Sequence, residues 1–291
     1  MSNNNKHITN NSNFAEESKK FFSGIGLSYT KTKNDVWTAL FEKEQAINSH
    51  VGKSFVLKRY LYAAAIILLL ISTGLFSRLY TRTINCPAGS QLSHQLPDNS
   101  KVSLNASSEL SYHPIWWHFE RTMHFKGEGF FEVQKGSKFS VISPNGTTSV
   151  MGTSFTIYDR TDIFKVTCIT GKVKVENKID EKILEPDFRA ELNSKGSITV
   201  EKSVELKEST AWLEKQFYFT STKLDKVFNE ISLRYGINIS MDPKFKTKDL
   251  YYSGNFPQLD SIENVLTLVC EPFNLTFKQM APDMYTIVQK Q

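Results

Sequence analysis

The chain has 291 residues, of which 40% are hydrophobic and 22% are charged, so it can form one large or two modest domains and bury a core. This composition excludes a wholly disordered protein. The net charge of +5 is uneven, because residues 1–59 hold nine basic and five acidic side chains and the remainder holds 26 and 25. Direct binding of nucleic acid would need a basic surface on the folded part, so it is not expected.

Two short amphipathic helices are predicted within residues 1–59. The first begins near Asn13 and ends at Gly24. The second begins near Thr32, with Asp35 at the capping-box position. Its apolar residues form one stripe: Val36, Trp37, Leu40 and Phe41. So short a segment cannot enclose a core of its own, so the stripe needs a partner; alternatively, the helices pack on each other or lie on a bilayer surface.

An uncharged run of 18 residues extends from Tyr60 to Ser77, between Arg59 and Arg78. As a helix it would be about 27 Å long, close to the ~30 Å of a bilayer core. We therefore predict a transmembrane helix over residues 60–77, followed by a linker over residues 78–90. The alternative is a fully buried core helix, although such a helix is seldom bracketed by arginines.

Basic residues on the two flanks of this run predict its direction. The N-terminal flank has Lys43, Lys53, Lys58 and Arg59, whereas the C-terminal flank has Arg78 and Arg82. Four against two places the N-terminus in the cytoplasm and more than two hundred residues on the other side. The run starts sixty residues into the chain and has its alanines at the front, so a cleaved signal peptide is not expected.

Residues 91–203 show short apolar runs with a period of two, such as Val102–Leu104 and Val166–Cys168. Turn-forming residues separate these runs: Pro97–Ser100, Gly127, Gly129, Pro144–Gly146, Gly152 and Gly171. The pattern predicts an all-β domain, with a sandwich as one possible arrangement.

Residues 211–290 combine strands with helical periodicity. A helix with apolar positions from Leu224 to Tyr235 is predicted to end at Gly236, with a strand on either side. The order recurs, with Asp260 as the predicted cap of a second helix and Glu263 three residues on. Two βαβ units would make a small α/β domain of about eighty residues.

Few residues form a pattern typical of a metal, disulfide, catalytic or sugar-binding site. The histidines at 94, 113, 118 and 124 match no metal-ligand spacing, and the cysteines at 86, 168 and 270 form neither a disulfide framework nor a zinc pattern. Cys168 and Cys270 are expected to be buried thiols. Glu128 and Glu132 could be a carboxylate pair, and Trp116 with Trp117 could stack on a sugar or pack on the core. We predict no catalytic residue, metal or cofactor.

Six blocks in the β region together resemble the FecR-type anti-sigma factor domain. These blocks are Leu96–Asn105 with Ser108–Tyr112, Arg121, Gly127–Val133, Phe139–Val141, Val150–Phe155 and Gly171–Val175. Arg234–Ile237 and Tyr252–Phe256 resemble the companion domain, which is related to the short N-terminal domain of secretins and TonB-dependent receptors. The resemblance covers roughly Cys86 to Gln289.

The resemblance implies a non-enzymatic, single-pass regulator in the bacterial inner membrane, with a solenoid-like β domain in the periplasm. Its cytoplasmic segment would hold an extracytoplasmic-function sigma factor. Its periplasmic part would sense the signalling domain of a TonB-dependent outer-membrane receptor, and proteases in or near the membrane would release the sigma factor. We predict that Val36, Trp37, Leu40 and Phe41 are the sigma-binding stripe.

Two other functions stay open. One is an envelope-anchored protein that binds polysaccharide or peptidoglycan through Trp116 and Trp117, without a role in transcription. The other is a membrane-anchored glycan hydrolase that uses Glu128 and Glu132. The binder needs two exposed tryptophans, and the hydrolase needs two acids that face one cleft.

Overall fold

The computed structural model divides the chain into two compact units, Met1–Ser72 and Thr73–Gln291. Within them the structure describes residues 10–24, 31–161, 163–193, 195–202, 206–243 and 249–290.

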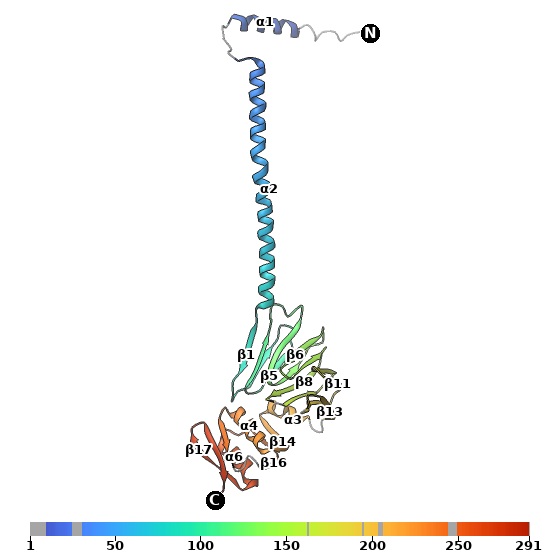
Figure 1. Cartoon of the computed structure of the whole chain (residues 1–291), viewed down its shortest axis with the longest axis vertical. Helices are drawn as coiled ribbons and strands as arrows, with labels where there is room; N and C mark the ends of the chain where they lie inside the picture. Colours follow the sequence, from blue (N-terminus) through green and yellow to red (C-terminus); the bar gives the residue numbers. More distant parts are fainter. Residues whose placement is uncertain are drawn as a thin grey trace. The chain divides into compact units, whose positions relative to one another are not determined.

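Helix α1 (Asn10–Gly24) is followed by α2 (Lys33–Leu79), a continuous helix of 47 residues (Figure 1). The predicted amphipathic helix and the predicted transmembrane segment are thus parts of one helix. Its start has the expected capping contacts: the hydroxyl of Thr32 donates to Asp35 Oδ2 at 2.6 Å, and the Asp35 N–H donates to Thr32 Oγ1 at 3.3 Å.

The second part of α2 is long and apolar enough to cross a membrane. This part, Leu57–Leu79, has 23 residues and a mean hydropathy of 2.0, and none of its most apolar stretch is buried inside the protein. A core helix would be covered by other elements, so this exposure contradicts the alternative of a buried helix.

After α2, thirteen of the described strands form one sheet. They are β1 (Arg82–Cys86), β2 (Leu92–Gln95), β3 (Lys101–Leu104), β4 (Ser108–Tyr112), β5 (Arg121–Glu132), β6 (Phe139–Ser143), β7 (Gly146–Val150), β8 (Ser154–Arg160), β9 (Ile163–Cys168), β10 (Val173–Glu176), β11 (Glu181–Leu184), β12 (Phe188–Leu192) and β13 (Ile198–Lys202). The segment 78–90, which we expected to be a linker, contains β1, and β1 pairs with β4. The domain therefore begins directly after the helix.

Strand β5 joins two layers of this sheet. Its first half pairs with β4 and with β6, and its second half pairs with β3 and β8. Gly127 lies between the halves with φ +112°, a conformation that a side chain disfavours, and the Ser108 hydroxyl donates to the Glu128 carbonyl at 3.0 Å beside it. Gly127 therefore bends a strand and does not lie in a turn between two strands. The result is a mostly β domain in which β1 to β13 form one nearly closed sheet.

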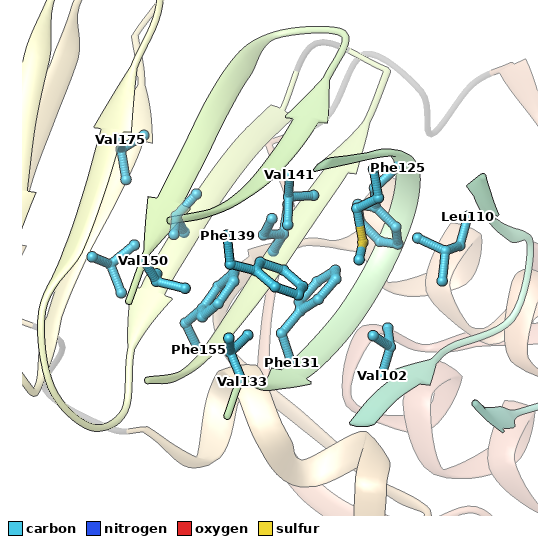
Figure 2. Packing of buried hydrophobic residues seen from close by; sticks show 14 of the residues in the cluster. Val102, Leu110, Phe125, Phe131, Val133, Phe139, Val141, Val150, Phe155 and Val175 are labelled. Carbon is cyan, nitrogen blue, oxygen red and sulfur yellow. The ribbon is translucent and has the colours of Figure 1, made fainter. Parts of the chain in front are cut away.

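The core of the β region is built from the inward residues of both layers (Figure 2). The rings of Phe131 and Phe155 stack with centroids 5.0 Å apart, and Phe125 packs edge-on against Phe131 at 5.2 Å. Cys168 and Cys270 are buried free thiols as predicted, and Cys86 is buried too.

The C-terminal elements are α3 (Lys207–Thr210), a short 3-10 helix η1 (Ala211–Glu214), β14 (Gln216–Lys223), α4 (Leu224–Tyr235), β15 (Asn238–Met241), β16 (Tyr251–Pro257), α6 (Ile262–Cys270), a second 3-10 helix η2 (Glu271–Phe273), β17 (Leu275–Ala281) and β18 (Met284–Gln289). Strand β14 pairs with β16, and the order β15-β18-β17 forms a second sheet. The two predicted βαβ units are therefore interleaved, because their first strands pair with each other.

The ends of the two C-terminal helices test the predicted caps. Gly236 ends α4 in the left-handed conformation, with φ +69°, as predicted. The prediction of Asp260 as the cap of α6 was wrong, because Ser261 is the N-cap and its hydroxyl accepts from the Asn264 N–H at 3.4 Å. Both residue types cap helices well, so the sequence alone does not separate them.

Candidate functional site

The predicted partner-binding stripe lies in the first turns of α2. Trp37, Leu40 and Phe41 are exposed by 52%, 54% and 57%, and Val36 is partly buried. The indole of Trp37 and the ring of Phe41 lie four residues apart on one helix face, with centroids separated by 5.9 Å. The structure therefore brings the four predicted residues together as one apolar surface near the start of the helix.

Helix capping holds the first turn of this surface in place. The Thr32 N–H also donates to Asp35 Oδ2, at 2.9 Å, so Thr32 and Asp35 bond in both directions. Hydrogen bonds from the side chain and backbone of Thr32 lower the pKa of Asp35, which keeps this carboxylate charged at the positive end of the helix dipole. The stripe is thus presented on an ordered turn.

Helix α1 carries a second exposed aromatic pair that the predicted stripe did not include. Phe21 and Phe22 are both exposed, and their rings meet edge-to-face with centroids 5.6 Å apart. The sequence signal was present, since we placed both residues on the apolar face of the first helix. Phe14 and Ile25 of that predicted face lie outside the described side chains.

The two adjacent tryptophans of the β region have different environments. Trp117 is only 1% exposed and packs edge-on against Tyr112 at 5.3 Å and Phe139 at 5.6 Å. Trp116 is half-buried and packs on Phe119 at 4.8 Å. The hypothesis of a sugar platform made of both tryptophans is therefore wrong, because one of them belongs to the core.

The two candidate acids do not share an environment either. Glu132 is exposed, whereas Glu128 is buried, accepts a hydrogen bond from Asn105 Nδ2 at 2.7 Å, and has Arg160 Nη2 at 3.9 Å. Burial, followed by the charge of Glu230, raises the pKa of Glu128 to about 7, against the opposing effects of Arg160 and Asn105. Glu128 lines a cavity of about 190 Å³ that Glu132 does not line. A glycosidase pair needs both acids across one cleft, so this geometry does not support the hydrolase hypothesis.

The histidines make separate structural contacts. His94 Nε2 lies 3.0 Å from the Tyr112 hydroxyl, and His113 Nδ1 lies 3.2 Å from the Thr81 hydroxyl. Within the described part of the chain, no three histidine, cysteine or acidic side chains cluster as a metal site would require.

Family models match most of the region that follows α2. The model described as FecR protein matches residues 82–174, and the model described as FecR, C-terminal matches residues 216–287. The chain belongs to the FecR family. The two matches extend from β1 into β10 and from β14 into β18, and β11 to β13 of this FecR-family protein lie outside them.

Solved structures give the same result for the fold. Two crystal structures of a proposed anti-sigma factor from Parabacteroides distasonis ATCC 8503, at 1.65 and 2.50 Å resolution, superpose on the FecR-family chain with TM-scores of 0.66 and 0.67. Each is 24% identical in sequence, and the matches cover 72% and 73% of this chain and 100% of each solved chain. At this identity the likeness establishes the fold. No curated protein matches the sequence.

Proposed function

We propose that this FecR-family protein is a single-pass anti-sigma factor of the bacterial inner membrane. The observation that carries the proposal is the exposed stripe Val36, Trp37, Leu40 and Phe41, which lies on the same helix as the exposed apolar segment Leu57–Leu79. An aqueous environment would penalise both surfaces, whereas a protein groove and a bilayer would cover them.

The apolar segment of α2 would cross the membrane with residues 1–59 in the cytoplasm. The excess of Lys and Arg before the span supports this direction. Phe41 precedes Leu57 by 16 residues, so the stripe would lie about 24 Å along the helix axis from the start of the span. The partner would therefore be held close to the membrane surface.

The partner on the cytoplasmic side would be an extracytoplasmic-function sigma factor. The stripe has the i, i+3, i+4 spacing of a helix that lies in an apolar groove. Trp37 is its largest exposed side chain, and a buried tryptophan is a frequent hot spot of binding energy. While bound, the sigma factor would be unable to join RNA polymerase.

On the other side of the membrane, the FecR and C-terminal regions would receive the signal in the periplasm. By the family resemblance, the source would be the signalling domain of a TonB-dependent receptor, and proteases in or near the membrane would free the sigma factor. We assign the protein no catalytic activity and no cofactor. The burial of Trp117 argues against the alternative of polysaccharide or peptidoglycan binding through both tryptophans.

The experiment is capture of the partner by the full chain in detergent from a lysate of the source bacterium, with bound proteins identified by mass spectrometry. Trp37→Ala is the test variant. Leu68→Ala is the matched control, because Leu68 is also an exposed apolar residue of the same helix but lies inside the proposed span. The proposal expects a sigma factor that is captured by the wild type and the control and lost with Trp37→Ala. Capture of no sigma factor by the wild type would contradict it.

A further inference from the structure

The loop between β4 and β5 exposes a cluster of large apolar side chains. Phe119 is 78% exposed and Ile115 is 48% exposed, and Trp116 packs on Phe119. The loop is ordered, because the N–H of Phe119 donates to the Trp116 carbonyl at 2.9 Å and Trp117 is anchored in the core. We call Ile115, Trp116 and Phe119 the apolar loop cluster.

This loop contacts the C-terminal end of α2. The guanidinium of Arg78 lies over the ring of Trp116, with 5.4 Å between the guanidinium carbon and the ring centroid. Just beyond the helix, His113 Nδ1 lies 3.2 Å from the Tyr80 carbonyl and 3.2 Å from the Thr81 hydroxyl. The apolar loop cluster is therefore fixed beside the last turn of the apolar segment Leu57–Leu79.

The last turns of the helix expose the same kind of surface. Leu75, Phe76 and Leu79 are all exposed, and they belong to the same compact unit as the loop. Lipid would cover these three residues if α2 crosses a membrane, so the loop cluster would lie at the level where acyl chains meet headgroups. Aromatic side chains are enriched at this level, because their rings are apolar but tolerate the polar boundary.

We propose that the apolar loop cluster docks on the lipid interface of the membrane that α2 crosses. The proposal rests on the proposed membrane anchoring of α2. The neighbouring exposed cations Arg78 and Arg82 suit lipid phosphates. Glu120 is the acidic residue that follows the cluster in sequence, and it accepts a hydrogen bond from the Thr122 hydroxyl at 3.2 Å. The β domain would thus be held against the bilayer by three side chains as well as by the helix.

The test uses nitroxide labels on the full chain, reconstituted in vesicles of phosphatidylcholine and phosphatidylglycerol. The three native cysteines are buried, so labels on the folded protein go to an introduced exposed cysteine. The reporters are Phe119→Cys and Ile115→Cys in the loop and Ile67→Cys in the helix. The control is Met151→Cys, since Met151 is also a large exposed apolar residue of the β domain. Power-saturation spectroscopy measures the accessibility of each label to oxygen, which prefers lipid, and to a water-soluble nickel complex.

The proposal expects both loop labels to be less accessible to the nickel complex and more accessible to oxygen than the label at 151. The label at 67 should be accessible to oxygen and inaccessible to the nickel complex, as expected at the bilayer centre. Loop labels as accessible to nickel as the label at 151, together with a lipid-exposed label at 67, would overturn the docking and leave the membrane span intact. A water-accessible label at 67 would overturn the anchoring, and the docking with it. A third outcome concerns lipid-free detergent. If the loop labels stay inaccessible to the nickel complex at high protein concentration and become accessible on dilution, the cluster binds a second copy of the chain, and the proposal is wrong.

Discussion

Substitution of Trp117 by alanine should be among the most destabilising single changes in the β domain, whereas the same change at Trp116 should have little effect. Burying about 200 Å² of indole surface is worth about 5 kcal/mol at 25 cal/mol per Å². The edge contacts with Tyr112 and Phe139 add about 1–2 kcal/mol. The indole N–H has no hydrogen-bond partner among the described residues, which subtracts about 1–3 kcal/mol. The expected loss for Trp117→Ala is therefore about 4 kcal/mol, in the range measured for large-to-small core changes.

The assay is urea denaturation of the full chain in detergent micelles, followed by near-ultraviolet circular dichroism. Trp116→Ala is the neighbouring control and should cost less than about 1 kcal/mol, because that ring is half-buried. Trp117→Phe keeps the aromatic packing and removes the unpaired N–H, so it should cost less than half of the alanine variant. Equal losses for the alanine variants at 116 and 117 would refute the distinction between a core anchor and a surface ring.

Two further predictions concern the bend of β5. Gly127→Ala should lower the free energy of unfolding by about 3 kcal/mol or more, because the added Cβ would overlap the Ser108 hydroxyl oxygen at a φ of +112°. Gly74→Ala, which has open space around it, should change the urea midpoint little, and equal midpoints for the two variants would contradict the bend. Burial raises the pKa of Glu128 above its value in the unfolded chain, so the unfolded state loses this proton first as the pH rises. The free energy of unfolding should therefore fall as the pH is raised from about 4.5 to 7, by up to about 3 kcal/mol. Glu128→Gln should reduce this fall, as measured from urea midpoints at pH 5 and 8, and an unchanged pH dependence would show that Glu128 is not its source.

Much of the β region could be predicted because alternation has a direct physical cause. Val102–Leu104 and Val166–Cys168 lie in β3 and β9 as expected, because every second side chain of a strand faces the core. The sequence did not decide between a turn and a strand bend at Gly127, since a glycine leaves the same sequence signal in both. The parallel pairing of β5 with β6 also depends on contacts that alternation does not encode.

In the candidate site, too, local features could be predicted from the sequence and long-range contacts could not. The capping pair Thr32 and Asp35 and the spacing of the stripe were predictable, because they depend on residues within one or two helical turns. The opposite environments of Trp116 and Trp117 were not, because neighbouring residues of one type in a loop differ only in what the rest of the fold places beside them. The position of the apolar loop cluster beside the end of α2 likewise depends on a contact between residues far apart in the sequence, Arg78 and Trp116.

We propose that the stripe on α2 binds a sigma factor. The most direct test of this proposal is the dissociation constant between the purified full chain and the sigma factor it captures, measured by isothermal titration calorimetry in detergent for the wild type, Trp37→Ala and Leu68→Ala. A hot-spot tryptophan is worth at least about 2 kcal/mol, so Trp37→Ala should raise the Kd by about 30-fold or more, and Leu68→Ala should leave it unchanged. The same Kd for all three proteins would contradict the assignment of the stripe as the sigma-binding surface.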